Sequence, residues 1–228
     1  MCIRDSSTGT EKMLINFGNS NWIRRGLDYP EKVKEAINKI KTDGPIDTIN
    51  AIKSKLDTPI PLGYCNVGIV EEVGDNISKF KVGDRVVSNA PHSDYALVSA
   101  NLCTLVPENI SDEDAVFTII GSIGLQGLRL ANPLFGETFL VIGLGLIGIC
   151  TAQLLKANGC KVLGIDPELN RCELAQSLGI DSIQIKENVD VERWCNKKTY
   201  NIGVDGVIIT AATSSNEPIN IASRVCRK

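Results

Sequence analysis

The 228-residue sequence lacks an excess of charge of one sign: 24 lysines and arginines stand against 27 acidic residues, a net charge of −3. It therefore lacks the excess of positive charge that is typical of proteins that bind nucleic acid or an anionic membrane surface. It also lacks long hydrophobic runs, since the longest, residues 139–150, is too short to span a bilayer and is interrupted by glycines. Neither nucleic acid nor a membrane is predicted as a partner.

Paired cysteine motifs are missing too. The eight cysteines include no CxxC pair and no zinc-knuckle spacing, so no disulfide framework can be read from them. Cys150 and Cys160 fall inside apolar runs, where a reduced thiol behaves as a small hydrophobic side chain. The first residues are too short and too polar for a signal peptide. Together these features predict a cytoplasmic protein.

What is present is typical of a folded globular chain, with 43% hydrophobic and 22% charged residues and a length that allows up to two domains. Residues 30–61 are helix-periodic and predict a helical hairpin. Short β-branched runs separated by turn signals then predict a small antiparallel β unit with strands at 67–73, 85–88, 95–98 and 104–106. A helix is predicted over 112–131, with Ser111 as its N-cap.

After Pro133 the pattern changes to alternating strands and helices. Strands are predicted at 139–142, 161–165, 182–185 and 204–210, and helices at 146–158, 168–178 and 189–198. This alternation is typical of an α/β fold in which a parallel sheet is covered by helices on both faces. The expected domains are residues 1–120 and 121–228.

The motif Gly143-Leu-Gly145-Leu-Ile-Gly148 follows an apolar strand and opens a helix. In that context it is typical of a dinucleotide site, because Gly143 allows a tight turn, Gly145 lets the main chain approach a diphosphate, and Gly148 lets the helix pack close to the sheet. The N–H groups of Leu146 and Ile147 would then face the diphosphate at the positive end of the helix dipole.

Asp166 ends the next strand, 18 residues past the last glycine. There it would accept hydrogen bonds from both hydroxyls of the adenosine ribose and repel a 2′-phosphate, so NAD is the predicted cofactor rather than NADP. Arg171 can reach the adenosine edge of the cofactor or can lie on the surface of the second helix. The alternative is that the glycines form only a tight turn without a ligand.

The stretch 61–74 (PLGYCNVGIVEEVG), together with 80–86, resembles the N-terminal signature of the medium-chain dehydrogenase/reductase superfamily, which is zinc alcohol dehydrogenase-like. Residues 141–148 resemble its cofactor signature. The resemblance implies a GroES-like β domain, incomplete and with a helical insertion, followed by an incomplete, doubly wound Rossmann NAD-binding domain. It further implies hydride transfer between a nicotinamide and a secondary alcohol or carbonyl of a small-molecule substrate held between the domains.

The chain departs from this family at its zinc ligands. Gly63-Tyr64-Cys65 stands where zinc-dependent members carry Gly-His-Glu, and residues 8–11 (TGTE) stand where they place an early cysteine ligand. With a single histidine the sequence offers no set of three ligands, so no metal is predicted. More narrowly, the chain resembles, at residues 7–13, 61–68, 91–92 and 120–127, a zinc-free branch found in bacterial bi-domain oxidoreductases of surface-polysaccharide pathways. This resemblance implies a sugar-related substrate and a fused second oxidoreductase module.

Without zinc, another group must polarise the carbonyl and move a proton. The candidates near the vacated metal region are Tyr64, a hydroxyl donor, and His92, the residue type used most often for general acid–base work. Glu11 is a third candidate. Each has a structural alternative: Tyr64 can be a packing residue, His92 a loop histidine bonded to the main chain, and Glu11 a surface residue.

Two other functions remain open from the sequence. One is a noncatalytic NAD(H)-binding module that senses redox state or serves as a scaffold for a partner. The other is a zinc-free enoyl or quinone reductase, which Asp166 disfavours because such enzymes prefer NADPH. Whether the protein forms a homodimer is also open.

Overall fold

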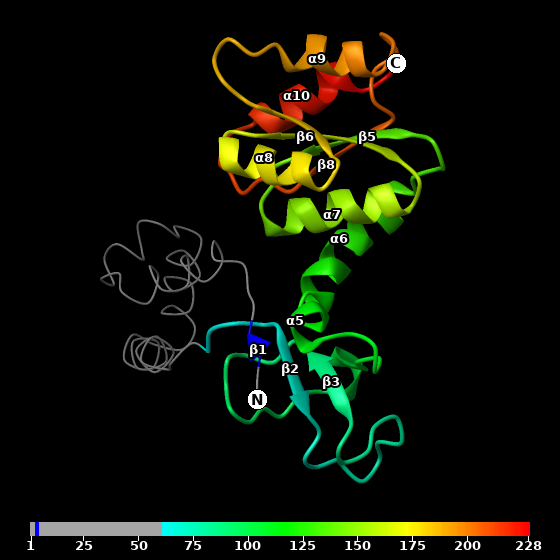
Figure 1. Cartoon of the computed structure of the whole chain (residues 1–228), viewed down its shortest axis with the longest axis vertical. Helices are drawn as coiled ribbons and strands as arrows, with labels where there is room; N and C mark the ends of the chain where they lie inside the picture. The colour runs from blue at the N-terminus through cyan, green and yellow to red at the C-terminus, as the bar shows by residue number, and fades with distance from the viewer. Residues whose placement is uncertain (1–2, 5–60) are drawn as a thin grey trace, which may run out of the picture. The chain divides into compact units, whose positions relative to one another are not determined.

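The computed structural model describes residues 3–4 and 61–228 (Figure 1). The chain divides into two compact units, residues 1–112 and 113–228, eight residues before the boundary expected from the sequence. The predicted helical hairpin at 30–61, the segment 8–11 and the candidate Glu11 lie outside the described residues.

The first unit contains an antiparallel sheet in the order β1-β2-β3-β4. Its strands are β1 (Ile3–Arg4), β2 (Asn66–Ile69), β3 (Arg85–Ser88) and β4 (Cys103–Leu105), the last preceded by the short 3₁₀ helix η1 (Ala100–Leu102). Val67 and Val87 are paired across β2 and β3 and are almost completely buried. Cross-strand apolar pairs of this kind stabilise a sheet.

The strand predicted at 95–98 was wrong. These residues belong to no strand of the structure, and the side chains of Tyr95 and Leu97 are exposed. The β-forming residue types in this segment are not enough on their own, because a strand needs a neighbouring strand to accept and donate its main-chain hydrogen bonds. In the described part of the chain this segment pairs with none.

The helix predicted over 112–131 forms as two helices, α5 (Asp112–Ala115) and α6 (Thr118–Ala131). A turn at residues 116 and 117 separates them. In this turn the N–H of Phe117 donates to Asp114 O, three residues earlier, at 3.2 Å, in place of the four-residue spacing of an α-helix. Helix α6 then packs against α7 (Leu146–Ala157), where a Cβ atom on Gly124 would lie 2.7 Å from Thr151 Oγ1. The two helices therefore approach more closely there than a larger residue at position 124 would allow.

The second unit is built on a parallel sheet in the order β7-β6-β5-β8, where β5 is Thr138–Ile142, β6 Lys161–Asp166, β7 Asp181–Gln184 and β8 Gly206–Ile209. The intervening helices are α7, α8 (Leu169–Ser177), α9 (Val191–Lys198) and α10 (Glu217–Val225). The predicted α/β fold with a doubly wound parallel sheet is confirmed, with elements within a few residues of the expected positions.

Both faces of this sheet are buried, as Figure 1 shows: α7 and α8 cover one face, and α9 and α10 cover the other. Each face of the sheet carries its own hydrophobic core, and alternate residues of β5 pack into the two cores. Phe139 and Val141 lie in the core on the α7 side, and Leu140 and Ile142 lie in the core on the α9 side. A strand buried on both faces is apolar along its length, which is why this segment reads as a continuous hydrophobic run.

Helix α10 was not predicted from the sequence. The sequence contains only weak signals for this helix. They are a proline near its first position, an acidic residue in its first turn, and the buried pair Ile221 and Val225, four residues apart. No helix among the described residues has the length and hydrophobicity needed to span a bilayer.

Candidate dinucleotide site

The bend between β5 and α7 contains three glycines with different structural demands. Gly143 has a φ of +96°, which side-chain-bearing residues rarely adopt, and a Cβ atom there would lie 2.8 Å from the main-chain nitrogen of Ala211. A Cβ atom on Gly148 would overlap the carbonyl oxygen of Gly143. A Cβ atom on Gly145 would meet no described atom within 4 Å. Packing therefore requires the first and third glycines, whereas Gly145 faces open space.

This open space lies at the N-terminus of α7. The main-chain N–H of Ile149 donates to Gly145 O at 2.9 Å and is the first bond of the helix ladder. The N–H groups of Leu146 and Ile147 precede that bond and lie at the positive end of the helix dipole. The diphosphate of a dinucleotide fits this place, because Gly145 leaves room for it and the helix N–H groups beside Gly145 can donate hydrogen bonds to it.

Asp166, the last residue of β6, is 1% exposed and already holds the bend in place. Its Oδ2 accepts a hydrogen bond from the N–H of Leu144 at 2.7 Å, and its Oδ1 accepts one from the N–H of Glu168 at 2.8 Å. The guanidinium of Arg171 lies 3.4 Å from Oδ2 and is half exposed. Arg171 is therefore a neighbour of the acid rather than an isolated surface residue.

These contacts limit what Asp166 can offer a ribose. A carboxylate has about four acceptor positions, and three donors occupy positions on this one. The remaining position, on Oδ1, can take one ribose hydroxyl. A second hydroxyl requires Arg171 to move, which its exposure and the long 3.4 Å contact allow.

A buried thiol also lies against Asp166. Cys172 Sγ donates to the main-chain oxygen of Asp166 at 3.6 Å. Burial is the main cause that raises the pKa of this thiol above its usual value. Cys172 therefore stays protonated near neutral pH and adds no second negative charge beside the carboxylate.

Thr210, directly after β8, was missed in the sequence analysis. Its Oγ1 donates to Gly143 O at 2.6 Å, and its N–H donates to Ile142 O at 2.9 Å. The local sequence contains no signal for this contact beyond a hydroxyl residue at the end of a predicted strand, because the approach depends on how β8 pairs with β5.

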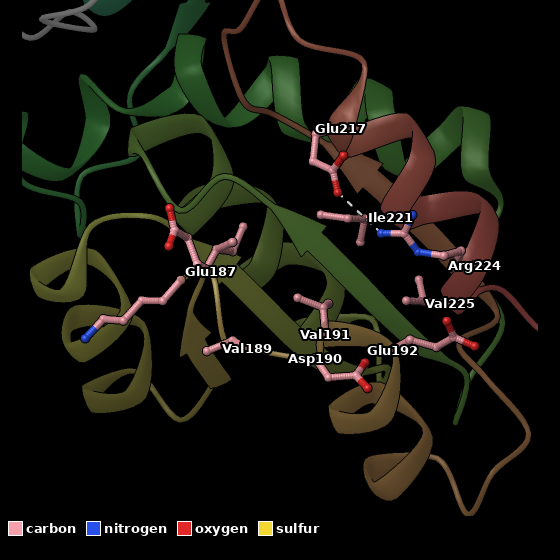
Figure 2. Close-up of a pocket in the computed structure, with 11 residues that line it drawn as sticks. Glu187, Val189, Asp190, Val191, Glu192, Glu217, Ile221, Arg224 and Val225 are labelled. Atoms are coloured by element: carbon pink, nitrogen blue, oxygen red, sulfur yellow. Dashed lines mark hydrogen bonds and ion pairs between the residues drawn. The ribbon is translucent and has the colours of Figure 1, made fainter.

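A cavity of about 350 Å³ opens beyond the end of β7 (Figure 2). Ile185 lines it, and the N–H of Ile185 donates to the main-chain oxygen of Asp166 at 3.0 Å. The lining residues Val191, Ile221 and Val225 belong to the core on the α9–α10 face of the sheet. Apolar side chains from the β7–α9 connection and α10 line it. Its charged lining residues are Lys186, Glu187, Asp190, Glu192, Glu217 and Arg224. Glu217 and Arg224 form an ion pair at 3.3 Å. Acids outnumber bases around this opening.

In the first unit the structure brings the two candidate catalytic residues into one neighbourhood. The N–H of His92 donates to Leu62 O at 2.7 Å. Gly63, with a φ of +81°, lies beneath the imidazole, and a Cβ atom on it would be 2.5 Å from the ring. Tyr64 is the next residue, and both candidates are partly exposed. A larger cavity of this unit, about 950 Å³, is lined by neither of them.

The described residues contain no group of three or more histidine, cysteine or acidic side chains that could hold a metal ion. Cys65, beside Tyr64, is completely buried. The donor set in residues 61–228 thus does not fit a catalytic zinc, and the corresponding segment 8–11 lies outside the described residues.

A doubly wound sheet with a glycine bend and a terminal acid on the neighbouring strand defines a dinucleotide-binding class of α/β protein. Two models of known protein families match this chain. A model of the alcohol dehydrogenase GroES-like domain matches residues 36–132, and a model of the zinc-binding dehydrogenase family matches residues 147–228. The chain belongs to the medium-chain, zinc-binding dehydrogenase superfamily, with a GroES-like domain followed by a Rossmann-like domain.

Two curated relatives illustrate this membership. An alcohol dehydrogenase of Geobacillus stearothermophilus is 28% identical over 72% of this chain and 57% of its own length. D-guloside 3-dehydrogenase of Escherichia coli is 32% identical over 66% of this chain and 44% of its own. Among solved structures, alcohol dehydrogenase TADH from Thermus sp. ATN1 is 25% identical with a TM-score of 0.65, over 73% of this chain and 58% of that one. The chain thus spans about half the length of the relatives it matches.

Proposed function

We propose that this protein is an NAD-dependent oxidoreductase that transfers a hydride between nicotinamide and a secondary alcohol or carbonyl of a sugar-related substrate, without a catalytic zinc. The observation that carries the proposal is the open space at Gly145 beside the buried carboxylate of Asp166. Bound nicotinamide would supply the hydride, and the residues of this chain would bind and orient the cofactor.

The preference for NAD over NADP rests on charge. A 2′-phosphate would approach a carboxylate that is almost completely buried, where like-charge repulsion is weakly screened. Arg171 is the one described cation paired with Asp166, and that pairing offsets its charge.

The substrate class rests on similarity. The names of two relatives describe sugar substrates: D-guloside 3-dehydrogenase, and a D-arabitol-phosphate dehydrogenase of Enterococcus avium that is 28% identical over 66% of this chain and 52% of its own length. Both names describe a dehydrogenase of a sugar or sugar-alcohol derivative, which supports a sugar-related substrate here.

For the proton transfer we propose Tyr64 and His92; the His92 ring lies against Gly63, the residue before Tyr64. The sequence Gly63-Tyr64-Cys65, in place of the Gly-His-Glu of zinc-dependent members, supports a mechanism in which protein side chains polarise the carbonyl. A fused second oxidoreductase module is part of the proposal, supported by the resemblance to bi-domain oxidoreductases alone. A homodimer is supported only by the resemblance to the superfamily, in which dimers built through the dinucleotide domain are common.

Calorimetry of the 228-residue chain with NAD, NADP and ADP-ribose tests the cofactor. We expect NAD and ADP-ribose to bind, and NADP to bind at least about tenfold more weakly, which corresponds to ~1.4 kcal/mol. An absence of heat with all three ligands would overturn the proposal.

Incubation of the protein with NADH deuterated at C4 and a panel of ketoses and other ketones tests the reaction. Deuterium in the alcohol product supports hydride transfer. Binding without transfer to any carbonyl favours a redox-sensing module, and transfer to an enone or quinone with NADPH as the better donor favours a zinc-free reductase; either result contradicts the proposed activity.

A further inference from the structure

We propose that Thr210 is a positioning residue that fixes the orientation of the Gly143–Leu144 peptide group and thereby keeps the glycine bend ready for a diphosphate. This inference rests on the proposed dinucleotide function. Thr210 lies in a different strand connection from the glycine motif, 67 positions further along the chain.

The Gly143–Leu144 peptide group is held at both ends. Its carbonyl oxygen accepts the hydroxyl proton of Thr210 at 2.6 Å, and its N–H donates to Asp166 Oδ2 at 2.7 Å. Strand β5 lies between β6 and β8 in the sheet, so one peptide group at the end of β5 is tied to both neighbouring strands. A peptide bound on its two sides cannot rotate without breaking both hydrogen bonds.

The hydroxyl of Thr210 is itself well placed. The main-chain N–H of Thr210 donates to Ile142 O at 2.9 Å, which continues the ladder between β8 and β5. Its Oγ1 also lies 3.3 Å from Ile142 O, but the 2.6 Å bond to Gly143 O is much the shorter. Because a hydroxyl has one proton to donate, Gly143 O is its principal acceptor.

Crowding fixes the carbonyl from the other side. Gly148 approaches Gly143 O so closely that any Cβ atom there would overlap it, and such an atom would also lie 2.8 Å from Thr210 Oγ1. The oxygen is thus enclosed between Thr210 and Gly148. Rotation of the peptide would turn a partly negative oxygen out of this enclosure, and an oxygen that came to face a bound diphosphate would repel it.

The same hydrogen bonds connect the proposed diphosphate position at the glycine bend with the proposed ribose position at Asp166. Thr210 orients the peptide whose N–H binds Asp166, and Asp166 is the residue proposed to hold the ribose. Loss of the hydroxyl should affect diphosphate binding most, because Asp166 Oδ1 keeps its separate bond to the N–H of Glu168 at 2.8 Å.

The test compares Thr210→Val, which keeps the shape but removes the hydroxyl, with Thr210→Ser, which keeps the hydroxyl. Binding of ADP-ribose and of adenosine to the 228-residue chain is measured by calorimetry or ligand-observed NMR. We expect Thr210→Val to weaken ADP-ribose binding by about tenfold, the size of one hydrogen bond, and adenosine binding by less than about twofold. Thr210→Ser should restore both.

Amide hydrogen exchange without ligand gives a second readout that general destabilisation of the fold would not reproduce. The N–H of Leu144 should exchange faster in Thr210→Val than in wild type and in Thr210→Ser, while amides in the middle of β6 remain unchanged. Equal exchange at Leu144 in all three proteins would overturn the positioning role.

The two proposals fail in different ways. A wild-type chain that binds neither NAD nor ADP-ribose overturns the proposed function, and this inference with it. If the wild-type chain binds both and Thr210→Val binds them equally well, or loses adenosine in parallel with ADP-ribose, only the role of Thr210 is overturned.

Discussion

The main-chain N–H of Leu144 donates to the Oδ2 of Asp166 at 2.7 Å, although the two residues are 22 positions apart. This bond ties the glycine bend after β5 to the acid at the end of β6. Asp166 therefore has a structural task in addition to the ribose contact expected from the sequence. Substitutions at this position should change stability as well as cofactor choice.

Replacing Asp166 by alanine should lower the free energy of unfolding by roughly 2–4 kcal/mol, since the N–H groups of Leu144 and Glu168 would both lose their acceptor, at about 1–3 kcal/mol for each one buried. Urea denaturation followed by circular dichroism measures the change. Glu168→Gln is the control, because its side chain is exposed and its bonding group is the main-chain N–H. An alanine variant as stable as wild type would contradict the structural task.

Alanine substitutions should separate the roles of two glycines. Gly145→Ala should fold with nearly wild-type stability, since φ of −69° suits alanine and the added methyl meets open space, yet should weaken NAD binding more than about tenfold. Gly148→Ala should lose stability by several kcal/mol, because its methyl group overlaps Gly143 O. Thermal unfolding and calorimetry, run on both variants, distinguish the two effects. Equal stability losses would argue against a ligand-facing Gly145.

Cys195 should make stability depend on alkaline pH. Burial raises the pKa of its thiol from 9.0 to about 12. Between these values the unfolded chain releases the proton and the folded chain retains it, so the free energy of unfolding should fall as pH rises, by at most about 1.4 kcal/mol per pH unit. Below pH 9 this contribution is fully present.

The measurement is urea denaturation from pH 8 to pH 10.5, for wild type and for Cys195→Ala as a control that lacks the titrating group. The wild-type curve should fall more steeply than the variant curve above pH 9. Parallel curves would show that Cys195 titrates normally in the folded state.

Replacing Tyr64 or His92 by phenylalanine should reduce turnover of the protein at least about a hundredfold, which is the usual size of a general acid–base contribution. Cofactor affinity should be nearly unchanged, because both residues lie in the first unit and the proposed dinucleotide site lies in the second. Steady-state kinetics with parallel NADH titrations separates the two quantities. If both variants turn over normally, neither residue takes part in proton transfer.

Prediction from sequence succeeded where the signals were local. The run at 139–142, the three glycines and the helix at 146–158 were found because hydrophobicity, a tight turn and helix periodicity are all readable within twenty residues. The strand at 95–98 failed because β-forming residues such as Tyr95 need a partner strand, and none of the described strands provides one.

The amino-acid sequence by itself determined the alternation of strands and helices from 139 to 198, the glycine bend and the acid that follows it, since each depends on residues close together in the chain. Only the tertiary structure decided which groups bind these residues: Leu144 and Glu168 at Asp166, and Thr210 at Gly143. The reason is that parallel pairing of β5 with β6 and β8 joins segments separated by one or more helices, and the register of such pairs is not visible in any local pattern.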